Sequence, residues 1–177
     1  MEIYLIRHTT PNIEKGICYG QADVSLASSF ENEWQALINK LPPTADIMYS
    51  SPLSRCLALA YKVGVHYHLP VIQDARLKEL NFGVWEMKYW NDIDQKKLQE
   101  WMDDYVNVKC PDGESYLDLA ERVQSFLINL KTEGYSKVII VTHHGVMKVI
   151  HSILENVDLK KGMEQKFEFA KPYLYKV

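Results

Sequence analysis

Short apolar runs rich in β-branched residues alternate along this chain with longer segments in which apolar residues recur at helical spacing. The runs lie at residues 3–6, 47–49, 71–72 and 138–141. The last of them is apolar at every position, which is typical of a strand covered on both faces. Strands that alternate with helices predict an α/β fold, namely a three-layer sandwich with a mostly parallel central sheet and helices on both faces.

The helical segments between these runs have recognisable ends. The apolar pattern of residues 25–40 stops at Pro42 and Pro43, and Pro52 suits the first turn of the next helix. Helices are also expected over residues 92–102 and 114–131 and directly after Gly145. Residues 167–169 and 173–175 are expected to form edge strands, and residues 82–85 a loop anchored by aromatic side chains.

The amino-acid composition restricts the kinds of molecule that the protein is expected to bind. The chain has 177 residues, 47% of them hydrophobic, which predicts one domain over residues 1–177. A net charge of −3 provides no basic excess for nucleic acid or an anionic membrane. The first apolar run is too short for a signal sequence, and no run approaches the roughly 18 apolar residues of a membrane span. We expect a cytoplasmic protein with reduced cysteines and a small-molecule partner; its oligomeric state stays open.

Polar residues follow three of the expected strands at the point where each strand ends. Arg7 and His8 follow the first run, Ser50 and Ser51 the second, and His143 and His144 the last. In open parallel sheets, ligands bind outside the carboxyl ends of the strands. We therefore expect these side chains to converge at one edge of the sheet.

An arginine and two carboxylates add further candidates. Arg55 lies on the first turn of an expected helix, where backbone N–H groups and the helix dipole favour an anion; the alternative is an ordinary surface arginine. Glu79 and Glu86 lie among apolar and aromatic residues, and such surroundings favour the protonated carboxyl that a general acid requires. Gly145, after the two histidines, permits close backbone approach.

Taken in order, five stretches of this chain resemble the histidine phosphatase superfamily, which has the phosphoglycerate mutase-like fold. These stretches are residues 5–8, 50–56, 77–86, 111–115 and 141–145. The resemblance covers nearly the whole chain. It implies that His8 is the nucleophile, that Arg7, Arg55 and His143 form the phosphate pocket, and that Glu79 is the acid. His144 stands where the superfamily more often has a small residue, and it either lines the substrate entrance or is packed.

The chain also departs from the superfamily pattern. Thr9 replaces the usual glycine after the first histidine, and the polar phosphate contact that usually follows is assigned here to Asn12. Residues 16–26 resemble the α-ribazole phosphatase branch, which implies α-ribazole 5′-phosphate as substrate and a place in cobalamin nucleotide-loop assembly. Tyr19, Trp85, Trp90, Trp101 and Tyr105 either shape a pocket for a flat base or belong to the core.

The resemblance implies a phosphoric monoester hydrolase that needs neither metal nor cofactor. Three alternatives stay open: a phosphoglycerate mutase, a broad-specificity phosphatase of the same fold, and a non-catalytic phosphate-binding protein. A metal site built on His66, His68, His143, His144 and His151 is a weaker interpretation, because only His66 and His68 are spaced as a local pair and no carboxylate motif accompanies them.

Overall fold

The computed structural model describes residues 1–177 and contains one five-stranded sheet. Its strands are β1 (Glu2–Arg7), β2 (Ile47–Ser50), β3 (Val71–Gln73), β4 (Lys137–Thr142) and β5 (Pro172–Lys176). They lie in the order β3-β2-β4-β1-β5. The first four are parallel, and β5 runs antiparallel to β1 at the edge. The apolar run of β4 therefore occupies the centre, as its sequence predicts.

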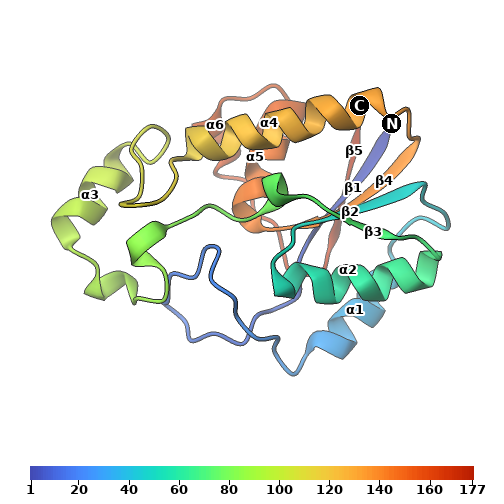
Figure 1. Ribbon diagram of the computed structural model, residues 1–177, viewed down its shortest axis with the longest axis horizontal. Helices are drawn as coiled ribbons and strands as arrows, with labels where there is room; N and C mark the ends of the chain where they lie inside the picture. The colour runs from blue at the N-terminus through green and yellow to red at the C-terminus, as the bar shows by residue number, and fades with distance from the viewer.

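Helices cover both faces of the sheet (Figure 1). The helices α1 (Phe30–Ile38) and α2 (Ser54–Tyr67) lie on one face, and α4 (Tyr116–Thr132) and α5 (His144–Leu154) on the other. The short α6 (Leu159–Gly162) packs against α5, and α3 (Gln95–Asp103) projects beyond the sheet. The predicted three-layer sandwich is confirmed. None of the helices combines the length and apolar composition that crossing a bilayer requires.

Buried side chains fill the spaces on either side of the sheet. The cluster beneath α4 and α5 contains 19 buried residues, and the cluster beneath α2 contains 10. Along β4, Val138 and Ile140 belong to the first cluster, whereas Ile139 and Val141 belong to the second. Successive side chains of a strand point to opposite faces, so a strand covered on both faces is apolar throughout.

Strand register brings the carboxyl ends of three parallel strands to one edge of the sheet. Arg7 of β1 pairs with Thr142 of β4, and Ser50 of β2 pairs with the residue before Thr142. The residues that follow these strand ends are His8, His143 and Ser51, and all of them are buried. Their convergence at the carboxyl edge was expected from the sequence.

Four helices, α1 to α4, begin two to five residues later than their sequence patterns predict. The helix expected over residues 25–40 is α1, which begins at Phe30, because residues 25–27 pair with the loop after β1. Ala27 N–H donates to the carbonyl of Thr10 over 3.1 Å. Pro52 precedes α2 and is not in its first turn, since Leu53 has extended backbone and donates its N–H to Ser51 Oγ over 3.3 Å.

The edge strand expected over residues 167–169 is wrong. Phe169 makes only an isolated bridge with Arg7, and the chain then turns at Ala170, which has φ +45°. The N–H of Ala170 donates to the carbonyl of Arg7 over 3.1 Å, so the pairing ends before a ladder can form. The other expected edge strand, over residues 173–175, is β5.

The remaining helices begin where side chains cap them. Asp94 accepts hydrogen bonds from the first backbone N–H groups of α3, and Ser115 and Asp118 form a capping box at the start of α4. The helix expected directly after Gly145 begins two residues earlier than expected, at His144. Residues Gly83–Trp85 form a 3-10 turn where a loop was expected, and two similar turns span Ala75–Leu77 and Trp90–Asp92.

Candidate active site

A pocket of about 180 Å³ lies at the carboxyl edge of the sheet, where the sequence predicts ligand binding. Arg7, Glu79, His144 and Gly145 contribute to its wall. Its other lining residues, most of them apolar or aromatic, are Ile17, Cys18, Tyr19, Gly20, Phe82, Trp90 and Tyr116. A few charged groups set in an aromatic wall are typical of sites for small molecules.

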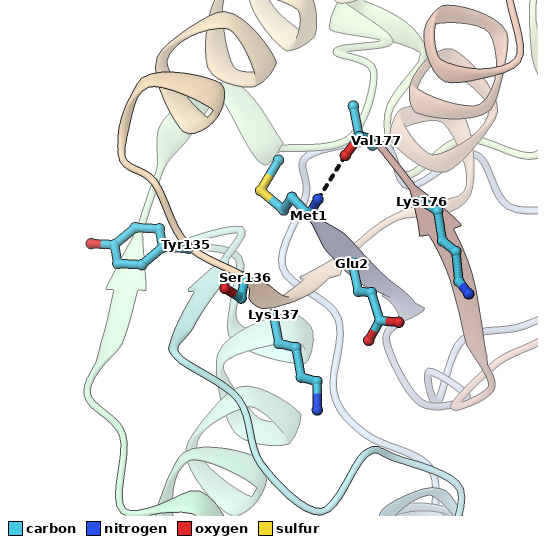
Figure 2. A pocket seen from close by; sticks show the side chains of 7 residues that line it. All are labelled: Met1, Glu2, Tyr135, Ser136, Lys137, Lys176 and Val177. Atoms are coloured by element: carbon cyan, nitrogen blue, oxygen red, sulfur yellow. Dashed lines mark hydrogen bonds between the residues drawn. The ribbon is translucent and has the colours of Figure 1, made fainter.

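A larger hollow of about 540 Å³ lies at the opposite end of the strands (Figure 2). Glu2 stands there between Lys137 and Lys176, its partners in the sheet register, and Met1 donates its terminal N–H to the Val177 carbonyl over 2.6 Å. The hollow contains none of the residues that follow the four parallel strands. Ligands of such sheets bind at the carboxyl ends, so the smaller pocket is the candidate active site.

His8 follows β1 directly and is only 1% exposed. Its Nδ1 lies 2.7 Å from the carbonyl oxygen of Thr9, so Nδ1 carries the proton and the lone pair lies on Nε2. Burial, followed by the charge of Arg55, lowers the pKa of His8 to about 3. The imidazole is therefore neutral near pH 7, as attack on phosphorus requires.

His143 lies beside His8, with 5.2 Å between the ring centroids. It is fully buried, and its Nε2 lies 2.7 Å from Ser51 Oγ and 3.4 Å from Cys56 Sγ. Burial and then Arg55 lower the pKa of His143 well below its ordinary value, so this ring is neutral too. Ser51, just before α2, and Cys56, in its first turn, thus fix the ring, and no sequence pattern marks them for this role.

Arg7 brings a guanidinium group to the pocket wall. One of its nitrogens donates to the Phe167 carbonyl over 3.1 Å, and the group lies 3.6 Å from the centre of the Phe169 ring. Burial lowers the pKa of Arg7, and the nearby Tyr19 and Glu79 oppose that shift. Its Nε is buried without a hydrogen-bond partner. A buried donor of this kind is available to a phosphate oxygen.

Arg55 occupies the first turn of α2, as predicted, and is fully buried. Its terminal nitrogens donate to the carbonyls of Gly20 and Ala22 over 2.5 and 2.9 Å, and its guanidinium lies 5.3 Å from the centre of the Tyr19 ring. Its Nε also lacks a partner. Arg55 therefore joins the helix N-terminus near His143 to the loop that carries Tyr19.

Glu79 faces the pocket, whereas the competing carboxylate Glu86 does not line it. One oxygen of Glu79 accepts the N–H of Leu80 over 3.0 Å, and the other accepts the N–H of Gly145 over 3.2 Å. Glu86 instead accepts the N–H groups of Gln21 and Phe82, which ties two loops together. The structure thus separates the two carboxylates into a pocket residue and a loop brace.

Arg122 of α4 holds the segment that presents Glu79. It donates to the backbone carbonyls of Arg76, Lys78 and Glu79 over 2.6, 2.7 and 2.9 Å. The same guanidinium pairs with Glu114 at 2.9 Å through two nitrogens. No sequence pattern predicts this contact, because the carbonyl partners lie 43 to 46 residues away and have no side-chain signature.

Two residues near the start of the chain mark departures from the superfamily pattern: Asn12, to which a phosphate contact is assigned, and Thr9, which replaces a glycine. Asn12 is exposed, donates to Ser25 Oγ over 3.3 Å and does not line the pocket. Thr9 is fully buried, and its backbone carbonyl accepts the hydrogen bond from Nδ1 of His8. Its hydroxyl has no hydrogen-bond partner. We therefore leave Asn12 out of the site that we propose.

The aromatic candidates divide between the pocket and the core. Tyr19 and Trp90 line the pocket. Trp85 belongs to a small buried cluster with Cys18 and Cys110, against which Trp101 packs, and Tyr105 packs on the main core. Trp85 is therefore a core residue, and Trp101 and Tyr105 are partly buried residues that pack against the core.

The histidine pair considered as a metal site lies in another part of the molecule. His66 is in the last turn of α2, and His68 caps its end. Eleven helical residues, or about 17 Å, separate His66 from Arg55. Nowhere in the chain are three or more His, Cys, Asp or Glu side chains grouped so that they could hold a metal ion.

The three-layer fold, with two histidines and two arginines brought to one edge of the sheet, defines the phosphoglycerate mutase-like class. The sequence model of the histidine phosphatase superfamily (branch 1) matches residues 3–171, and the chain belongs to this superfamily.

Relatives and solved structures whose names state an activity are similar to this chain over most of its length. Phosphoserine phosphatase 1 of Hydrogenobacter thermophilus is 26% identical over 167 residues, which is 91% of this chain and 79% of that protein. The adenosylcobalamin/α-ribazole phosphatase of Escherichia coli is 29% identical over 157 residues, covering 85% and 77%. The crystal structure of the α-ribazole phosphatase from Shigella flexneri superimposes with a TM-score of 0.91 at 25% identity, over 98% of this chain and 89% of that one. The chain is a phosphoric monoester hydrolase that acts on small phosphorylated substrates.

Proposed function

We propose that the chain hydrolyses phosphomonoesters in two steps through a phosphohistidine at His8. The observation that carries the proposal is the state of this residue, a buried neutral imidazole whose Nδ1 is held by the Thr9 carbonyl. In the first step Nε2 bonds to phosphorus and the ester P–O bond breaks. In the second, water attacks the phosphoimidazole, which releases phosphate and restores neutral His8.

We assign Arg7, Arg55 and His143 to the nonbridging phosphate oxygens. Both arginines have a buried Nε with no protein partner, and leaving such a donor unpaired costs free energy that a phosphate oxygen would recover. Fixed guanidinium groups supply the positive charge that metal ions supply in other phosphatases. We therefore expect turnover to persist in excess chelator.

Glu79 is assigned the proton transfers of both steps. Its carboxyl group lines the pocket and is held by two backbone N–H groups, so it is positioned rather than mobile. When protonated it donates to the departing alkoxide, and as the carboxylate it then takes a proton from the attacking water. A positioned acid or base of this kind contributes about 10²–10⁴ in rate.

We propose α-ribazole 5′-phosphate as the substrate. Support comes from the likeness to two proteins named as α-ribazole phosphatases. It also comes from the wall of the pocket, where Tyr19, Phe82 and Trp90 are half-buried. Aromatic side chains bind flat apolar groups through stacked or edge-to-face contacts, which suits the base of this substrate.

Phosphoserine is a second candidate because of the name of the Hydrogenobacter thermophilus relative. Its leaving group carries a carboxylate, which an aromatic wall does not pair, and an ammonium, which needs only one aromatic face. The charged residues that line the pocket are Arg7 and Glu79, and the proposed mechanism already uses both. The composition of the wall therefore favours the flat substrate.

Trapping the covalent intermediate tests the mechanism. In Glu79→Gln, an aryl phosphate can still phosphorylate His8, because its leaving group departs without a proton, but the base for the second step is missing. We expect a burst approaching one equivalent of product and an alkali-stable phosphate on the peptide that contains His8, with none in His8→Ala. Phosphate on His143 or His144 would identify a different nucleophile. Absence of any covalent species in rapid-quench samples would favour direct attack by water.

Steady-state comparison of substrates tests the assignment of the leaving group. We expect kcat/KM for α-ribazole 5′-phosphate to exceed that for O-phosphoserine at least tenfold, since burial of an aromatic group contributes about 1.5–3 kcal/mol. With 3-phosphoglycerate we expect inorganic phosphate as the product; formation of 2-phosphoglycerate would support the mutase alternative. A preference for phosphoserine would transfer the assignment to the second candidate.

A further inference from the structure

We propose that His144 is a specificity-determining residue that hydrogen-bonds a hydroxyl group on the leaving group of the substrate. The substrates are then phosphate esters of polyols or sugars, rather than of simple alcohols or amino alcohols. The inference rests on the proposed function, in which the ester is cleaved between His8 and Glu79.

His144 is placed on the leaving-group side of the site. It is the first residue of α5, between His143 and Gly145, and it lines the pocket with Arg7 and Glu79. The Gly145 N–H holds the carboxyl group that we assign to the ester oxygen. The His144 ring therefore stands beside the carbon chain beyond that oxygen, while His8 and His143 lie buried at the phosphate.

One nitrogen of this ring lacks a partner. The Nε2 of His144 is buried without a hydrogen bond, and the ring makes an edge-to-face contact with Phe167, with centroids 6.2 Å apart. By contrast His151, about two turns further along α5, lies with its Nδ1 3.0 Å from the hydroxyl oxygen of Tyr175. Buried polar groups are nearly always paired, so the unpaired Nε2 at the pocket wall points to a partner from the substrate.

The charges around His144 select the kind of partner. Burial, followed by Arg7 and Lys148, lowers the pKa of His144 to about 3, so the ring is neutral near pH 7. The same two cations disfavour an ammonium group at this position. A neutral imidazole presents one donor and one acceptor, and only a group that both donates and accepts can pair with Nε2 in either tautomer. A hydroxyl group meets that condition.

Two esters that share a carbon skeleton provide the test. Glycerol 3-phosphate carries two hydroxyl groups that propyl phosphate lacks. We expect the wild-type protein to prefer glycerol 3-phosphate in kcat/KM, and the preference to fall about tenfold in His144→Phe, because only the hydroxylated ester loses a partner. His144→Gln, whose terminal amide reaches the position of Nε2, should restore part of the preference.

A matched variant on the same helix provides the control. His151→Phe removes a histidine outside the pocket and should leave the ratio of the two kcat/KM values unchanged. An equal loss for both esters in His144→Phe, or a ratio equal to that of the wild type, would overturn the role of His144. Hydrolysis of an aryl phosphate that depends on His8 is measured alongside. Its absence in the wild type would overturn the proposed function itself, and with it this inference.

Discussion

At the scale of single residues, Gly145 packs closely against the carboxyl group of Glu79. A β-carbon added at Gly145 would lie 2.5 Å from one carboxylate oxygen of Glu79. That oxygen is the end of a flexible side chain, so it would move aside while the helix backbone stays in place. The glycine is therefore required for the position of the proposed proton donor, and not for a turn.

Gly145→Ala should lower kcat/KM for an alkyl phosphate by about 10²-fold, at the lower end of what a positioned general acid contributes. With an aryl phosphate the loss should be much smaller, because that leaving group departs without a proton. Paired kinetics on the two esters and a thermal melt of each protein check the prediction. An equal loss on both esters would mean that the added methyl group disturbs the phosphate pocket rather than Glu79.

The residues of the site could be predicted where the chain itself marks them. His8, Arg55 and His143 lie at strand or helix ends, and parallel topology brings such ends together. Tyr116 also lines the pocket, but only the path of the chain between α3 and α4 brings it there. The position of Tyr116 in the sequence does not predict that it lines the pocket.

At the scale of secondary structure, α4 holds the loop that presents Glu79. Arg122 satisfies three carbonyls of that loop, and its partner Glu114 also accepts the N–H of Asn81 over 2.9 Å. A planar guanidinium can serve several acceptors at once, which an ammonium group cannot do in the same geometry. The loop therefore depends on one side chain of the neighbouring helix.

Arg122→Met should destabilise the fold by about 2–4 kcal/mol, because it removes charge-assisted hydrogen bonds and leaves Glu114 and the carbonyls without their partner. Turnover of alkyl phosphates should fall with it, as Glu79 loses its support. Urea unfolding measures the first effect and steady-state kinetics the second. Arg122→Lys keeps the charge, so it should recover part of the stability and less of the turnover. Full recovery of both in the lysine variant would show that charge alone suffices.

Some of the helices and strands could be predicted from the sequence, and others could not. The four parallel strands follow from short apolar runs, since burial on both faces imposes that composition. The start of α1 could not be predicted, because residues 25–27 fit a helical pattern but bond the loop after β1 instead. The mistaken strand near Phe169 has the same origin, a tertiary contact that overrides a local preference.

At the scale of the whole molecule, the fold keeps uncharged histidines in its interior at the carboxyl edge of the sheet. His8 and His143 are buried between the sheet and the segments that cover its end, and the pKa of each is lowered chiefly by burial. In the unfolded chain the same imidazoles meet water and titrate near 6.5. Folding is therefore linked to proton release in mildly acid solution.

The free energy of unfolding should fall as the pH is lowered from 7 to 5. Between about pH 6.5 and 3 the unfolded chain binds a proton at His8 that the folded chain does not, so acid favours unfolding throughout this window. For His8 alone the loss reaches about 2 kcal/mol at pH 5, at about 1.4 kcal/mol for each pH unit below 6.5, and His143 acts in the same direction. The pKa of Asp118 is lowered from 3.8 to about 2, chiefly by its hydrogen bond to Lys109. Protonation of this carboxylate therefore changes the stability mainly between those two values, below the measured range of pH 7 to 5. Urea titrations at several pH values should therefore show a slope that becomes shallower in His8→Asn, whereas a wild-type stability independent of pH between 7 and 5 would show that these histidines are not held neutral by the fold.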